Sequence, residues 1–198
     1  MSASTTPDHE LSQAPASSRV IPATLVWAPL LIALVALAGS LWLSIEMKLK
    51  ACPLCFYQRT FVMGVVAVLG IGLLTGPRHR AVLNLLALPL AVGALGVAIF
   101  HVYLELTGKL ECPAGLMGIG TSPQQSLAVL IVLLVFVAAG IIRGQKVGEP
   151  HPAAAGAAAV LGLLLAWGAV ASSPPMPPTP AQAYTTPLDI CRPPFHPQ

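Results

Sequence analysis

Residues 48–70 read KLKACPLCFYQRTFVMGVVAVLG and place two cysteines and an arginine at the mouth of an apolar run. Two residues separate Cys52 from Cys55, and Arg59 follows four positions after the second cysteine. The apolar run has about the length that an α-helix needs to cross a bilayer, roughly 20 residues. The stretch therefore predicts a membrane helix that begins with a CxxC pair.

The composition supports a membrane protein. Of the 198 residues, 56% are hydrophobic and only 9% are charged, whereas a soluble domain has about 25% charged residues. The formal net charge of +3 is too small to favour a nucleic-acid partner. We therefore predict an all-α membrane protein.

The apolar runs predict five transmembrane helices: 24–44, 56–74, 83–104, 125–142 and 153–171. The expected architecture is a four-helix transmembrane bundle plus a fifth transmembrane helix and an extended, Pro-rich tail. The predicted parts are a polar cytoplasmic N-terminus at 1–22, the bundle at 23–142, the fifth helix at 153–171 and the tail with Cys191 at 172–198.

Basic residues in the short links predict the orientation of the chain. Five lie at the N-terminus and in the links 75–82 and 143–152, and four lie in the opposite links and the tail. Because more basic residues remain in the cytoplasm, the first set is placed inside. All four cysteines then share the outer face, and disulfides persist on that face of a bacterial inner membrane. We therefore expect the cysteines on the periplasmic side.

The CxxC pair lies where a helix is expected to begin. Pro53 suits the first helical turn, where its missing N–H costs no hydrogen bond. Cys55 would then lie near the positive end of the helix dipole, which favours a thiolate. Arg59 is four residues further along the same face and would add a positive charge. Tyr57 and Gln58, which follow the pair, are candidates to line the same pocket, and Tyr57 is alternatively an aromatic anchor at the membrane interface.

A CxxC pair alone leaves three readings open: a metal site, a redox pair and a structural disulfide. A structural metal site needs four ligands, and the other candidates, Cys112, Cys191 and the histidines, form no second tight pair. A thioredoxin-like βαβ pattern is absent from the sequence. A redox pair at a membrane face therefore points to a lipid-soluble electron acceptor, a quinone.

Two motifs resemble the DsbB family of membrane disulfide-generating proteins. CPLCFYQR at 52–59, followed by an apolar span, is similar to the start of that family's second span. FHVYLEL at 100–106 is similar to the outer end of its third span. The resemblance covers about residues 25–142.

The resemblance implies the roles of five residues. Cys52 and Cys55 would form the quinone-coupled pair, with Cys55 next to the quinone ring. Arg59 and His101 would contact the quinone, which is ubiquinone or menaquinone. Cys112 matches the first cysteine of a second pair, which exchanges with a soluble, thioredoxin-like oxidant of the DsbA type. The family's chemistry thus predicts a thiol:quinone oxidoreductase that generates disulfides.

The second pair departs from the family pattern. Better-known members carry both of its cysteines between spans three and four, but here that loop contains only Cys112. We predict that Cys191 replaces the missing partner. The tail can reach on the order of 55 Å at about 3.1 Å per residue, and a fifth span would bring it to the correct side.

The sequence also leaves two alternative functions open. A vitamin K epoxide reductase-like enzyme also couples a CxxC pair to quinone, but its cysteine pairs follow in the reverse order. A non-catalytic membrane subunit with two structural disulfides would also explain four cysteines. Sensitivity of the cysteine redox state to quinone depletion distinguishes the last alternative from an enzyme.

Overall fold

The computed structural model describes residues 24–74, 80–145, 152–175, 177–180 and 182–195. It contains five long helices: α1 (Thr24–Ile45), α2 (Pro53–Leu74), α3 (Arg80–Leu106), α4 (Ser122–Gln145) and α5 (Pro152–Ala171). Each is long and apolar enough to cross a membrane. The predicted all-α architecture is confirmed, and each helix extends at most a few residues beyond the predicted span.

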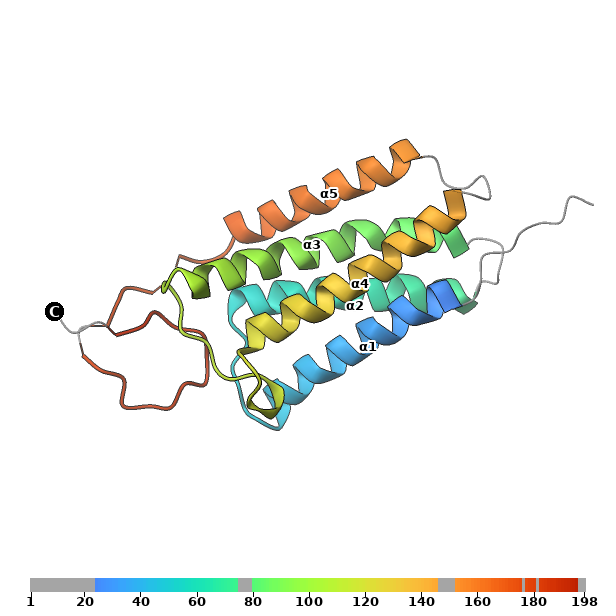
Figure 1. The fold of residues 1–198 in the computed structure, drawn as a ribbon. Helices are drawn as coiled ribbons and strands as arrows, with labels where there is room; N and C mark the ends of the chain where they lie inside the picture. The colour runs from blue at the N-terminus through green and yellow to red at the C-terminus, as the bar shows by residue number, and fades with distance from the viewer. Residues whose placement is uncertain (1–23, 75–79, 146–151, 176, 181, 196–198) are drawn as a thin grey trace, which may run out of the picture.

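The helix α3 is the centre of the bundle. It packs against α2, α4 and α5, while α1 packs against α2 and α4. Figure 1 shows α5 alongside α3, at the edge of the bundle. Small side chains on α3 permit this close approach, and four of its alanines are fully buried: Ala87, Ala91, Ala94 and Ala98.

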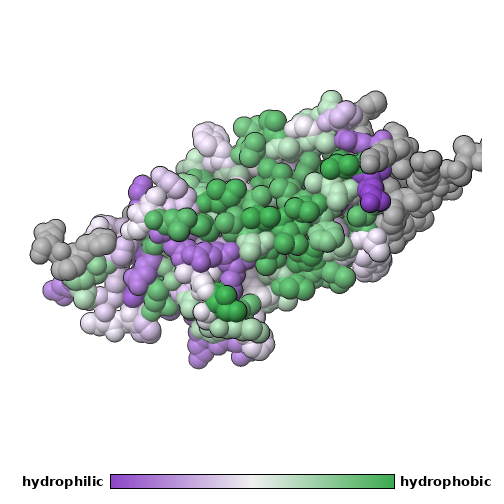
Figure 2. Space-filling view, in the orientation of Figure 1, coloured by the Kyte–Doolittle hydropathy of each residue, from purple (hydrophilic) through white to green (hydrophobic). Residues whose placement is uncertain are grey.

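The outer surface is apolar along the middle of the molecule. Figure 2 shows a broad hydrophobic band with hydrophilic side chains gathered toward the two ends. Large apolar side chains such as Trp27, Leu31 and Trp167 are at least half exposed on this surface. Such exposure would be costly in water but suits contact with lipid tails, so the chain is a multi-pass membrane protein.

The loop between α3 and α4 and the C-terminal tail cover the same end of the bundle (Figure 1). The GLMGIG run of this loop, residues 115–120, contains one 3-10 turn, Leu116–Gly118. Gln125 on α4 fixes this turn, because its amide nitrogen donates to the Leu116 carbonyl at 2.9 Å and its amide oxygen accepts from the Leu116 N–H at 2.8 Å.

The described part of the tail is irregular, as its proline content predicts, but it is held at two points. Asp189 pairs with Lys50 at 2.9 Å and also accepts a backbone hydrogen bond from it. Arg192 and Glu111 exchange two backbone hydrogen bonds of 2.8 and 3.0 Å. These contacts tie the tail to the start of α2 and to the loop that carries Cys112.

Several parts of the orientation argument lie outside the described residues. These are the N-terminus 1–22 with Arg19, the link residues Arg78 and His79, and Lys146. The orientation of the chain therefore remains a prediction.

The contact between α3 and α5 supplies the first test. A side chain added at Gly162 would meet Val92 Cβ at 2.6 Å and the Pro89 carbonyl oxygen at 2.7 Å. We expect Gly162→Val to push α5 away from α3 and to destabilise the protein by about 1–3 kcal/mol. Thermal unfolding in detergent measures this, with Gly156→Val as the control, since no atom lies within 4 Å of a Cβ there. Equal unfolding temperatures for the two variants would contradict the packing.

Candidate functional site

The CxxC pair forms the first turn of α2. The Cys52 carbonyl accepts the Phe56 N–H at 3.0 Å, which makes Cys52 the N-cap residue and Pro53 the first helical residue, as predicted. The Cys52 sulfur accepts the Cys55 N–H at 3.3 Å. Both cysteines are free thiols, with their sulfurs 2.8 Å apart. The pair is therefore in its dithiol form and its sulfurs are already close together.

The thiol of Cys52, which lies just before α2, is unusually acidic. Its pKa falls from 9.0 to about 5, chiefly because the Cys55 thiol donates a hydrogen bond to its sulfur. Burial opposes this change, whereas hydrogen bonds from His101 and from the Cys55 backbone N–H favour it. The sequence pointed to Cys55 as the thiolate. The N-cap position explains the difference, because the donors of the first turn converge on the Cys52 sulfur.

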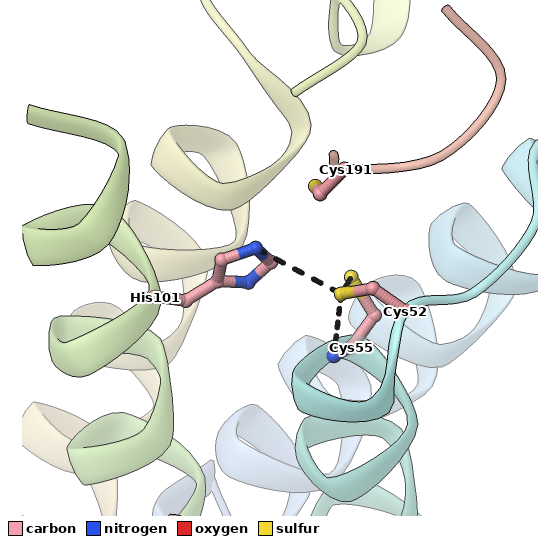
Figure 3. Close-up of side chains that lie close together, drawn as sticks. All are labelled: Cys52, Cys55, His101 and Cys191. Carbon is pink, nitrogen blue, oxygen red and sulfur yellow. Dashed lines mark hydrogen bonds between the residues drawn. The ribbon is translucent and has the colours of Figure 1, made fainter. Parts of the chain in front are cut away.

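The imidazole of His101 lies between the two cysteine pairs. This fully buried residue of α3 has its Nε2 atom 3.8 Å from the Cys52 sulfur and 3.5 Å from the Cys112 sulfur. Figure 3 shows its ring pointing from α3 toward the start of α2. One ring nitrogen therefore touches a sulfur of each pair.

A polar chain behind His101 orients its ring. The Gln58 side-chain nitrogen lies 3.5 Å from Nδ1, and the Gln58 side-chain oxygen accepts the Ser126 hydroxyl at 2.6 Å. With Gln58 donating to Nδ1, the ring proton is on Nε2 and points at the sulfurs. Gln58 was expected only to line the pocket, and Ser126 was not among the predicted site residues. Ser126 lies on α4 and carries no local signal, because the contact depends on helix packing.

The second cysteine pair is closed. A disulfide joins Cys112 in the α3–α4 loop to Cys191 in the tail. The neighbouring backbone pair, Glu111 with Arg192, places the two strands of chain side by side. The tail thus supplies the second cysteine that the loop lacks. This is the pairing of Cys112 with Cys191 that the sequence predicted.

A cavity of about 200 Å³ adjoins both pairs. It lies between α1, α2 and α4, and the predicted residues that line it are Cys55, Arg59, His101 and Cys191. Cys52 and Cys112 do not line the cavity. Of the CxxC pair, it is therefore Cys55 that faces the cavity.

The guanidinium of Arg59 is anchored to α1. Its Nε and Nη2 atoms donate to the Ser40 hydroxyl and carbonyl at 3.0 Å, and Nη2 also donates to the Ser44 hydroxyl at 2.6 Å. Within the described residues, Nη1 makes no hydrogen bond. Arginine has five N–H donors, so the two on Nη1 remain available to an oxygen in the cavity.

Tyr57, a candidate to line the pocket, does not line the cavity. It is on another face of α2, and its hydroxyl lies 3.5 Å from the Ser172 hydroxyl at the end of α5. Successive residues of a helix point about 100° apart, so Tyr57, two positions after Cys55, points about 160° away from it.

The sequence itself matches one family. The family model described as "Disulfide bond formation protein DsbB" matches residues 22–126. The chain belongs to the DsbB family.

Individual members of this family resemble the chain to different extents. Disulfide bond formation protein C of Bacillus subtilis (strain 168) is 29% identical over 135 residues, which are 61% of this chain and 94% of that protein. The probable disulfide formation protein of Chlamydia trachomatis serovar D is 31% identical over 99 residues, 45% of this chain and 71% of that protein. Disulfide bond formation protein B of Burkholderia thailandensis is 34% identical over 84 residues, 41% of this chain and 49% of that protein. No solved structure matches.

The DsbB match ends inside α4 and so excludes α5 and the tail. Cys52, Cys55, His101 and Cys112 lie within it, whereas Cys191 lies beyond it. The four cysteines of this disulfide bond formation protein are thus divided between the family region and the C-terminal segment.

The pKa of Cys52 gives the second prediction. In chelator-treated, fully reduced protein, the alkylation rate of Cys52 should stay nearly constant above about pH 6 and fall as the pH drops through about 5, because only the thiolate reacts. His101→Ala should raise this midpoint. Peptide mass spectrometry after timed iodoacetamide treatment measures it, and a wild-type midpoint near that of an ordinary cysteine, about 8.5, would contradict the assignment.

Proposed function

We propose that the chain is a thiol:quinone oxidoreductase of the bacterial inner membrane that generates disulfides and reoxidises a soluble, thioredoxin-like partner of the DsbA type. The observation that carries this proposal is the meeting of a closed and an open cysteine pair at one histidine, beside a cavity with a free guanidinium edge. Membership of the DsbB family supports the same chemistry.

The cavity fits the head group of a quinone. Its volume of about 200 Å³ exceeds the roughly 150 Å³ that holds a benzene ring in another protein, so a substituted ring can enter. Leu43, Val62 and Leu130 supply apolar walls, while Arg59 Nη1 can donate to a carbonyl oxygen of the ring. A bound ubiquinone or menaquinone would accept two electrons and two protons from the Cys52/Cys55 dithiol and become the quinol.

The partner is proposed to react first with Cys191. A partner thiolate attacks the Cys191 sulfur, and the bond to Cys112 breaks. Cys191 is the more exposed sulfur of the disulfide, whereas Cys112 is buried beside His101. His101 Nε2–H can then donate its proton to the departing Cys112 thiolate, since the two atoms are 3.5 Å apart. The second partner thiol closes the partner's own disulfide and releases Cys191.

Disulfide exchange between the two pairs follows from the closeness of their sulfurs, since those of Cys52, Cys55 and Cys191 lie within 4.8 Å of one another. The Cys191 thiolate attacks Cys52 in an oxidised Cys52–Cys55 pair, and Cys55 leaves toward the cavity. Cys112 then attacks Cys191, which closes the outer disulfide and releases Cys52. Two electrons pass inward in this sequence, and the product has a closed outer pair and an open inner pair. Those are the states of the two pairs in the structure.

The cysteine end of the bundle is proposed to face the periplasm. The two cysteine pairs, the α3–α4 loop and the tail occupy one end, where Lys50 pairs with Asp189. Arg143, in the last turn of α4, lies at the other end. A soluble thiol partner can reach the outer pair only from the side on which the tail is exposed.

The test of the function is quinone reduction by purified protein. We expect Cys55→Ser to abolish reduction of a short-chain ubiquinone or menaquinone analogue by a dithiol. Arg59→Lys should slow the reaction at least about tenfold, because Lys cannot keep both the α1 anchor and the free Nη1 edge. Arg143→Lys, an exposed change at the opposite end, is the matched control. Full turnover in Cys55→Ser would overturn the proposal, and a cysteine redox state indifferent to quinone would favour a structural role.

The contact of His101 with both pairs gives a separate prediction for transfer between them. In quinone-free, fully oxidised protein, a dithiol should reduce the inner pair about 100-fold more slowly in His101→Gln than in the wild type, because the acid for the leaving sulfur is lost. Acid quenching and thiol labelling resolve the order of reduction. If the inner pair is reduced at rates within twofold of each other in the wild type and in His101→Gln, proton transfer by His101 is excluded and the residue has only a packing role.

A further inference from the structure

We propose that the fully reduced chain contains a metal site for Zn²⁺, made by Cys52, Cys55, Cys191 and His101. The sequence argued against a metal because the candidate ligands outside the CxxC pair form no second tight pair. The fold removes this objection, since the ligand atoms of these four residues all lie within 4.8 Å of one another. The site goes beyond the proposed oxidoreductase function, and it exists whether or not a quinone binds.

The distances are close to those of a tetrahedral zinc site. Zn–S bonds of about 2.3 Å and Zn–N bonds of about 2.0 Å place neighbouring ligand atoms roughly 3.5–3.8 Å apart. Nε2 of His101 already lies 3.8 Å from the Cys52 sulfur, and the two CxxC sulfurs, now 2.8 Å apart, need only to separate by about an ångström. Three of the ligands project from two packed helix ends, so most of the site is formed in advance.

The fourth ligand depends on the redox state. In the structure Cys191 is bonded to Cys112, and a metal needs a thiolate rather than a disulfide sulfur. Reduction of this bond by two electrons and two protons from a dithiol partner would free Cys191. The tail would remain nearby, because Asp189 and Arg192 are still held by Lys50 and Glu111.

The surroundings suit a soft, thiolate-bound cation. Three thiolates and Zn²⁺ carry a net charge of −1, and Arg59 and Lys50 line the same cavity. Sulfur and imidazole ligands favour Zn²⁺ over Mg²⁺ or Ca²⁺. When Nε2 binds a metal, Nδ1–H needs an acceptor. Gln58 can provide one by turning its amide, because the Ser126 hydroxyl can accept the amide N–H in return.

Occupation of this site would halt the enzyme in its reduced form. The metal would hold one sulfur of the outer pair and both sulfurs of the inner pair as thiolates, so neither disulfide could re-form until it left. Zn²⁺ would thus be an inhibitor that recognises only the four-thiol state.

The test uses Co²⁺ as a spectroscopic probe on the full chain in detergent, without a histidine tag. Protein reduced by a phosphine and freed of the reductant under argon should bind one Co²⁺ with the intense visible bands of a tetrahedral thiolate site. Zn²⁺ should displace it. Protein with the outer disulfide intact should bind at least about 100-fold more weakly. An octahedral spectrum, or equal binding in the two redox states, would overturn the proposal.

Variants assign the ligands. Cys52→Ser, His101→Ala and Cys191→Ser should each weaken Co²⁺ binding at least tenfold or abolish the tetrahedral bands. Cys112→Ser is the matched control, since it leaves Cys191 as a free thiol and should bind Co²⁺ without reduction of any outer disulfide. Loss of binding in Cys112→Ser with retention in Cys191→Ser would refute this ligand set. Circular dichroism checks that each variant is folded, and failure of quinone reduction would not affect these results.

Discussion

The architecture depends on the burial of one imidazole between two cysteine pairs. His101 makes its contacts from near the end of α3, the helix that packs against three others. Cys52 reaches it from the first turn of α2, and Cys112 reaches it from the loop that follows α3. A shift of any of these elements by a few ångströms would break the contacts of 3.5 and 3.8 Å and separate the pairs. The exchange geometry is therefore a property of helix packing rather than of a local motif.

The fifth helix completes this geometry from outside the family region. The tail must return to the cysteine end of the bundle, and α5 brings the chain back across the apolar band to that end (Figure 1). It packs on α3 through Gly162 and Ala166, which let the backbones approach closely. Two backbone hydrogen bonds then align Arg192 with Glu111. The loop thus supplies one cysteine of the outer pair and the tail supplies the other, after one more span-length helix.

Local patterns predicted the helices and the start of α2, because both depend on short-range physics. Apolar runs of span length are sufficient to find helices in a membrane, and Pro53 marks the first turn of one. The identity of the acidic thiol was missed, since it is set by donors from Cys55 and by His101 on another helix. Gln58 and Ser126 were missed as a pair for the same reason: their contact joins residues 68 positions apart. Cys191 was named as a possible metal ligand, but its position beside the CxxC pair depends on how the tail folds back.

The fold both stabilises the charge of Arg59 within a membrane helix and places it beside the cavity. An arginine within a membrane span destabilises the protein unless its N–H groups have hydrogen-bond acceptors. Ser40 and Ser44 satisfy three of the five N–H groups and thereby also fix α1 against α2. The remaining edge lies at a cavity that Cys55 shares. If α1 bound all five donors, the cavity would offer no charge to a ligand. If it bound none, the guanidinium would turn toward the polar interface. The partial anchoring of Arg59 holds a positive charge beside the inner sulfur, where an electron acceptor would develop negative charge.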